Sequence, residues 1–113
     1  MIEKNFKLRS DQIAPLVVSS GWCMATDRIM VDGSPIGYMQ RENPVAGGDS
    51  GWRFFAGDED DEYMSNDDNH GVYDLNTVVN YDTSVIPFLD APSGSRFDKV
   101  AGDTYVLLDA PSP

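Results

Sequence analysis

The chain contains a single cysteine, Cys23, and a single histidine, His70. A lone cysteine cannot form an internal disulfide, and its place between Trp22 and Met24 is typical of a small buried hydrophobic residue. Zinc-ligand spacings, phosphate-binding loops and dinucleotide-binding glycine patterns are absent from the sequence, which therefore predicts no cofactor. A histidine-dependent nucleophile would have to use His70, whose loop setting is typical of a solvated or turn-capping histidine. We therefore expect no enzyme activity.

Long apolar runs are also missing. No run approaches the ~20 residues of a membrane-spanning helix. The first residues, MIEKNFKLRSDQ, have no apolar stretch behind their charges, which argues against a signal peptide. With one cysteine, these absences predict a reduced, soluble, cytoplasmic protein. A length of 113 residues and a hydrophobic content of 41% suit a single domain over residues 1–113. Residues 1–12 are expected to form a loose lead and residues 109–113 a loose tail.

Basic residues are scarce in the second half of the chain. Residues 1–57 contain six acids and six bases, whereas residues 58–113 contain thirteen acids and two bases, so the second half carries the whole net charge of −11. The negative electrostatic field of such a charge distribution repels nucleic acid and anionic membranes, and it attracts basic proteins or cations. Acidity also raises solubility, so a merely solvated acidic surface is the alternative interpretation.

Strand and turn signals alternate along the first half of the chain, and helical spacing follows. β structure is expected at 17–18, 22–25, 29–31, 36–41 and 52–56, with a turn at 32–35, a loop at 43–51, and closing strands at 96–100 and 104–108. Apolar residues at 75–79 predict a short helix with Asp74 as its N-cap, and Ser84 is expected to cap a second short turn. The pattern predicts an α+β domain: a twisted, mostly antiparallel sheet of about six strands with one or two short helices.

Five consecutive acids, Asp58 to Glu62, follow directly on the aromatic strand at 52–56. Five like charges repel one another, and one element cannot bury them all. The strand before them is largely apolar and must be packed, with Trp52 and Phe54 buried on one face. Arg53 is expected on the opposite face, paired with a carboxylate of the acidic loop. The junction therefore predicts a dense anionic loop presented from a rigid base.

Oxygen-rich loops also suit calcium, but the ligand order of an EF-hand is missing. Counting from Asp58, the sixth residue is Tyr63 where glycine is required. Counting from Asn66, the sixth is Gly71, but the twelfth is Thr77 where a bidentate glutamate is required. The sequence predicts no dedicated metal site, and adventitious cation binding is the alternative.

The segment DSGWRFFAGDEDDEYM at 49–64, followed by NDDN at 66–69, carries a family resemblance. Together with residues 21–44 and 73–89, it resembles a bacterial family of immunity proteins from polymorphic toxin systems, the immunity protein 33 type, formerly domain-of-unknown-function family 2185. The resemblance implies a protein that binds and neutralises a cognate toxin domain.

A basic toxin surface would meet the acidic loop. We expect the partner to contact Asp58, Glu59, Asp60, Asp61, Glu62, Tyr63, Asp67 and Asp68. The alternative from another class is a non-enzymatic structural or regulatory module whose acids serve solubility or bind a cation.

Overall fold

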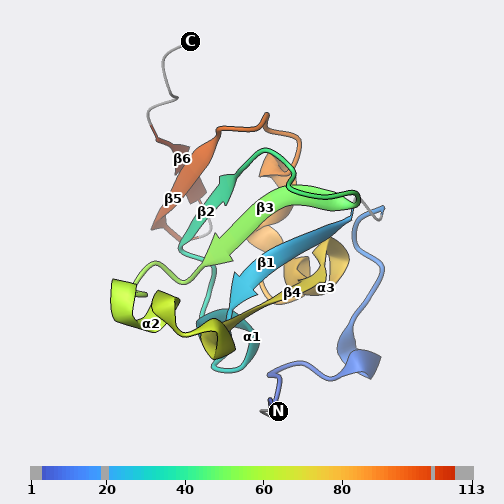
Figure 1. Cartoon of the computed structure of the whole chain (residues 1–113). Coiled ribbons are helices and arrows are strands. Elements are labelled where there is room, and N and C mark those ends of the chain that lie inside the picture. Colours follow the sequence, from blue (N-terminus) through green and yellow to red (C-terminus); the bar gives the residue numbers. More distant parts are fainter. Residues whose placement is uncertain (1–3, 19–20, 103, 109–113) are drawn as a thin grey trace.

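The computed structural model describes residues 4–18, 21–102 and 104–108, which form one six-stranded sheet (Figure 1). The strand order is β4-β1-β3-β2-β5-β6, and β1 and β3 are parallel while the other neighbours are antiparallel. The strands are β1 Trp22–Thr26, β2 Tyr38–Arg41, β3 Asp49–Phe55, β4 His70–Asp74, β5 Arg96–Ala101 and β6 Thr104–Leu107. The predicted α+β class with a mostly antiparallel sheet is confirmed.

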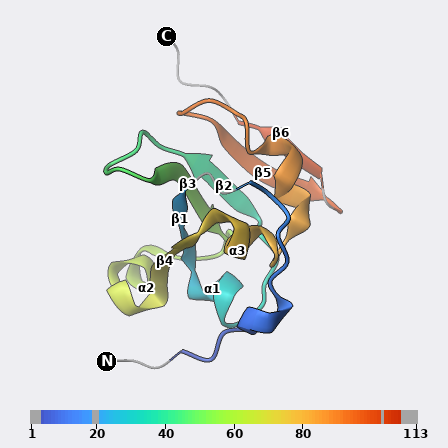
Figure 2. The ribbon, with the colours of Figure 1, turned by 90° about the vertical axis from the view of Figure 1, so that its right-hand side faces the viewer.

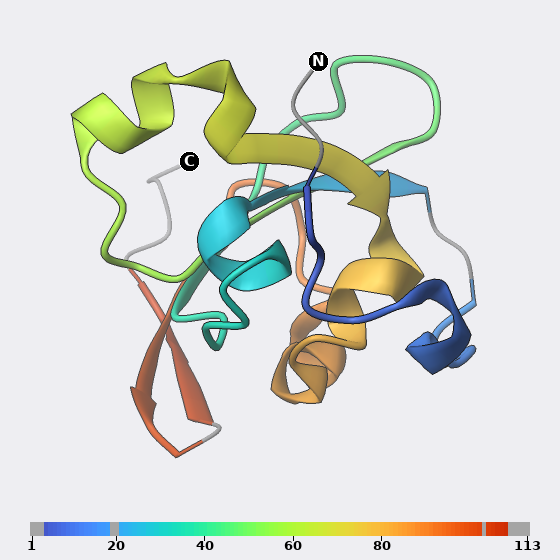
Figure 3. The same ribbon diagram turned by 90° about the horizontal axis from the view of Figure 1, so that it is seen from below.

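The helical segments are short and lie mainly on one face of the sheet. They are α1 Asp27–Met30, α2 Asp61–Ser65 and α3 Leu75–Val79, with the 3₁₀ turns η1 Ser10–Gln12, η2 Asp67–Asn69 and η3 Thr83–Phe88. Helices α1 and α3 and turn η3 cover one face, while no described helix crosses the face turned to the viewer in Figure 1 (Figures 2 and 3). Helix α2 stands beyond the end of β3. In the described part of the chain, no helix has the length and apolar character that crossing a membrane requires.

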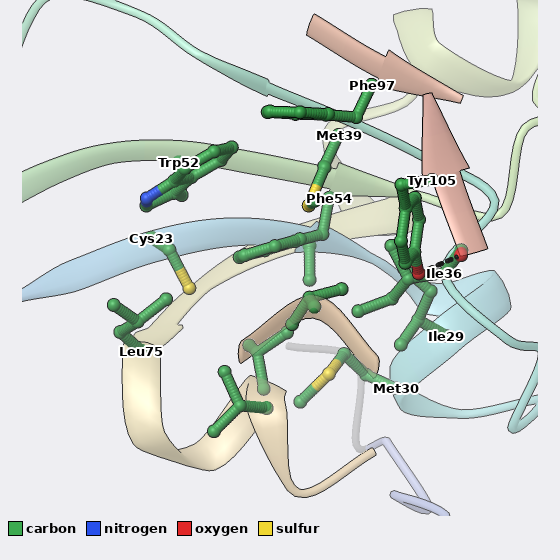
Figure 4. Close-up of a cluster of buried hydrophobic side chains, with 14 residues drawn as sticks. Cys23, Ile29, Met30, Ile36, Met39, Trp52, Phe54, Leu75, Phe97 and Tyr105 are labelled. Atoms are coloured by element: carbon green, nitrogen blue, oxygen red, sulfur yellow. Dashed lines mark hydrogen bonds between the residues drawn. The ribbon is translucent and has the colours of Figure 1, made fainter. Parts of the chain in front are cut away.

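The core lies between the sheet and the covering helices (Figure 4). Alternation along β3 points Trp52 and Phe54 into it, and their side chains are 0% and 1% exposed, as predicted. The two rings stack with centroids 5.9 Å apart, and the Trp52 indole Nε1 donates to the Leu89 carbonyl at 3.2 Å. Cys23 is also fully buried, as predicted. The other core residues are Ala25, Ile29, Met30, Ile36, Met39, Leu75, Val78, Val79, Val85, Phe97 and Tyr105.

Several predicted elements are wrong in type or extent. No strand forms at 17–18, and the expected β structure at 29–31 is instead helix α1 and the residue after it. Strand β3 begins at Asp49, inside the predicted loop at 43–51. A short apolar pair such as Ile29 and Met30 suits a helical turn as well as a strand, so its packing against the core decides its conformation.

The predicted helix starts are partly right. The Asp74 carboxylate accepts from the Asn76 backbone N–H at 3.2 Å and caps α3, as predicted. Turn η3, however, is capped by Asp82, which accepts from both the backbone N–H and the hydroxyl of Ser84. Ser84 is therefore a donor inside the turn rather than its cap.

The N-terminal segment contacts α1 and the helical layer. Lys4 forms an ion pair with Asp27 at 2.8 Å, and the Lys7 backbone N–H donates to the Met30 carbonyl. The expected loose tail at 109–113 lies outside the described residues.

Candidate partner-binding surface

Glu59 fastens the acidic segment to the end of the sheet. Its carboxylate accepts hydrogen bonds from the backbone N–H groups of Ala56 and Gly57, both at 2.8 Å, and from the Thr26 hydroxyl at the end of β1. Burial alone would raise the pKa of the Glu59 carboxyl, but these hydrogen bonds outweigh it and hold the pKa below its usual range. Glu59, which is one of the predicted partner contacts, is an internal anchor of the segment and carries a negative charge at neutral pH.

Asp60 starts helix α2. Its carboxylate accepts from the Tyr63 backbone N–H at 2.7 Å, which is the N-cap arrangement, and Asp61 and Glu62 occupy the first turn. Acids in a first turn interact favourably with the unpaired N–H groups there, which offsets part of their mutual repulsion. The expected loop is therefore a short helix that leaves Asp61 and Glu62 exposed.

Arg28 from α1 braces the other side of the segment. Its Nε lies 3.3 Å from an Asp58 carboxylate oxygen, and its guanidinium lies over the Tyr63 ring, 4.8 Å from the ring centroid. Tyr63 is half-buried by this contact. The predicted partner residue Tyr63 thus packs against Arg28, and Asp58 keeps most of its side chain, 70%, exposed.

Turn η2 continues the acidic surface. The Asn66 side chain accepts from the Asp68 backbone N–H, and the Asn69 side chain donates to the Tyr63 carbonyl, so the turn folds back on α2. Asp67 and Asp68 are exposed. Of the eight predicted contact residues, the structure thus brings six to one exposed surface and turns two toward the protein. We define the acidic surface as Asp58, Asp60, Asp61, Glu62, Asp67 and Asp68.

Arg53 does not reach this surface, contrary to the prediction. Its guanidinium makes two hydrogen bonds to the Asp49 carboxylate, at 3.0 and 2.8 Å, and a third to Glu42 at 3.1 Å. The Trp22 ring covers it, 5.7 Å from the guanidinium carbon, so that the Arg53 side chain is only 6% exposed. The pair lies on the uncovered face because residues four apart on a strand point the same way.

The uncovered sheet face carries an ordered line of polar side chains along β2. The Tyr38 hydroxyl donates to the Gln40 side-chain carbonyl at 2.8 Å, and the Gln40 amide donates to Glu42 at 2.6 Å. Glu42 continues the line to Arg53. The sequence predicted a half-buried strand here but not the contact of Glu42 with Arg53, because that contact depends on the register of β2 with β3. The one available signal was the period-2 alternation around buried Met39.

The remaining reactive groups have structural surroundings. Cys23 donates to the Tyr73 carbonyl at 3.5 Å, and burial raises the pKa of its thiol far above the usual range, which disfavours the reactive thiolate. The His70 ring lies 3.3 Å from the Met64 carbonyl and 4.0 Å from Asp67. His70 begins β4, which the sequence did not predict.

Calcium is expected to have little effect on stability. Among the described residues, no group of three or more acidic, histidine or cysteine side chains converges as a metal site. Titration of millimolar calcium into metal-free protein should therefore shift the melting temperature by no more than about a degree or two. Differential scanning calorimetry measures this shift, with magnesium as the matched control. A saturable rise at micromolar calcium would support the cation-binding alternative instead.

The comparisons with known proteins give one match. The family model of the immunity protein Imm33 domain matches residues 23–108 of the chain. That range runs from the second residue of β1 to the residue after β6, so it holds both the acidic surface and the sheet. No curated protein matches the chain, and no solved structure does.

Proposed function

Because the chain belongs to the Imm33 immunity protein family, we propose that it binds a cognate bacterial toxin domain and neutralises it by covering its active site or a surface that it needs. The acidic surface is the part of the molecule that meets the toxin, and the toxin presents a basic surface to it. The protein acts in the cytoplasm by binding alone, without catalysis, and neither nucleic acid nor membrane is its partner.

The observation that carries this proposal is the way the acidic surface is built. Its six carboxylates stand on a segment that Glu59 holds to the end of β1 and to the residues after β3, and whose helix Asp60 caps. Holding like charges together costs free energy in the unbound protein, and a basic partner relieves that cost. Toxins that attack nucleic acid need a basic surface for phosphates, and a fixed row of carboxylates can occupy such a surface in place of the substrate.

Neutralising two exposed acids of α2 should slow association with the toxin. The variant carries Asp61→Asn and Glu62→Gln, since neither side chain is the helix cap. The matched control, Asp11→Asn with Asp90→Asn, also removes two negative charges, from exposed positions away from α2. We expect the α2 variant to associate about three- to tenfold more slowly at low salt, because charge steers encounter, and the control to change by less than half as much.

Surface plasmon resonance with the cognate toxin domain measures these rates. The difference should shrink toward 1 M salt, where the Debye length is ~3 Å. Thermal unfolding should show that both variants are as stable as the parent. Equal association rates for the parent and the α2 variant at low salt would exclude the acidic surface as the steering site. If the parent neither binds the toxin nor protects cells from it, the proposed function itself is wrong.

A further inference from the structure

A row of side chains crosses the uncovered sheet face near α2. Phe55 on β3 is paired with Tyr38 on β2, Tyr38 with Asp98 on β5, and Asp98 with Val106 on β6. Side chains paired in this way on one face of a sheet are direct neighbours. The Phe55 and Tyr38 rings lie 5.6 Å apart at 46°, and Val106 is 41% exposed. Two aromatic rings and an exposed aliphatic residue have the composition of an interface core.

A recess of about 230 Å³ lies between this row and α2. Its walls are the aromatic rings, the Met64 side chain from α2 and the Gly57 backbone, whose φ of +109° turns the chain from β3 toward the acidic segment. The Tyr38 ring is held in place, because its hydroxyl donates to the Gln40 side chain and the Gln40 amide donates to Glu42. An ordered recess loses little conformational freedom when it is filled.

The charge that lines this recess is negative. Asp98 and Glu59 both line it. Among the described residues, no side-chain hydrogen bond or ion pair reaches the Asp98 carboxylate. The adjacent Lys99 is directed elsewhere, since its ammonium group lies 2.8 Å from Asp82, and Arg28 contacts Asp58. No lysine or arginine of the described chain lines the recess.

The aromatic walls and the negative charge of the recess favour the binding of a positively charged side chain. An arginine or lysine side chain can lay its apolar stem along Phe55 and Met64 and bring its charge to Asp98 and the faces of the rings. An apolar or acidic side chain would instead desolvate the Asp98 carboxylate without compensation. We propose that this recess receives one lysine or arginine side chain of the toxin as the anchor of the complex. The inference rests on the proposed function, and it assigns the lifetime of the complex to the recess and its formation rate to the acidic surface.

Replacing Asp98 with asparagine keeps the shape of the recess and removes its charge. We expect Asp98→Asn to weaken the complex about 30-fold, mainly through faster dissociation, because breaking a desolvated charge pair acts on the dissociation rate. Phe55→Leu, which keeps an apolar wall but removes the ring face, should also speed dissociation. Asp90→Asn, a single exposed acid outside the recess, is the matched control and should stay within about twofold of the parent. Thermal unfolding of each variant confirms that it is folded.

A double-mutant cycle then identifies the anchor. Each lysine and arginine of the toxin domain is changed to alanine and measured against both the parent and Asp98→Asn. We expect one toxin position at which the two changes are far from additive, by about tenfold or more. If Asp98→Asn dissociates like the parent, or if the changes are additive at every basic toxin position, the recess does not hold the anchor. The proposed function would remain intact. Failure of the parent to bind any toxin would overturn the proposed function first.

Discussion

Replacing Trp52 with alanine should lower the free energy of unfolding by about 3–5 kcal/mol. The Trp52 ring is fully buried, stacks on Phe54 and contacts Phe97, with centroids 5.9 and 6.4 Å away. Its truncation leaves a large cavity and removes the hydrogen bond to the Leu89 carbonyl that ties β3 to the end of η3. Urea denaturation followed by far-UV circular dichroism measures the change without relying on tryptophan fluorescence.

Trp22 is the matched control for this experiment. It is half-buried on the uncovered face, where it covers Arg53, so Trp22→Ala should cost clearly less than Trp52→Ala. If Trp52→Ala unfolds like the parent and loses the toxin instead, Trp52 anchors the interface and the core assignment is wrong. An equal loss for both variants would show that the uncovered face is packed as firmly as the core.

Replacing Arg53 with methionine should lower the free energy of unfolding by about 3–5 kcal/mol as well. The loss arises because the Asp49 carboxylate stays behind in the folded variant. Its side chain is completely buried and would lose both of its hydrogen bonds from the guanidinium. Two backbone donors, Val45 and Gly51, would still hold the carboxylate, but no cation would balance it. Chemical denaturation at neutral pH measures the loss.

The double variant Asp49→Asn, Arg53→Met tests whether this loss comes from the ion pair. It removes both charges, so it should be more stable than the sum of the single variants predicts, by about 0.5–3 kcal/mol. Strict additivity would assign the loss to packing of the arginine stem alone.

The same pair makes stability depend on acid. Hydrogen bonds from Arg53 outweigh burial and hold the pKa of the Asp49 carboxyl far below its usual range. A lowered pKa in the folded state contributes stability above the ordinary aspartate pKa, and this contribution is lost as the pH falls below about 4. In that acidic range, the free energy of unfolding of the parent should therefore fall relative to that of the double variant. A gap that stays constant down to pH 2 would contradict this origin.

The sequence predicted the elements whose signals are local. Asp74 before an apolar group at helical spacing was sufficient for α3, and alternation was sufficient to bury Trp52 and Phe54. Strand β4 was missed because Gly71 and Asp74, which are unfavourable in strands, flank only two strand formers, Val72 and Tyr73, and the strand forms by pairing with β1. The pairing partner lies far away in the sequence, so no local window contains it.

The sequence predicted the acidic segment as a group but only part of its local structure. An N-terminal helix signal was present, since Asp60 is followed by two more acids, yet the repulsion of five charges favoured a loop. Nothing local distinguishes Glu59 from its neighbours, because its role depends on Thr26 at the end of another strand. Alternation along the strand would have predicted Asp49 as the partner of Arg53, but only if the strand had been predicted to begin at Asp49.

The strand order also sets when this protein can fold during its own synthesis. Strand β1 lies between β3 and β4, both of which leave the ribosome after it, and the layer that covers it is completed by α3 later still. The pairings of β2 with β3 and of β5 with β6 are local in the sequence, but the pairings of β1 with β3 and with β4 are not. A nascent chain that ends before β4 therefore holds β1 with one side unpaired and Cys23 and Ala25 uncovered. Strand β1 therefore gains its second neighbour and the covering helix α3 only after residue 79 has emerged.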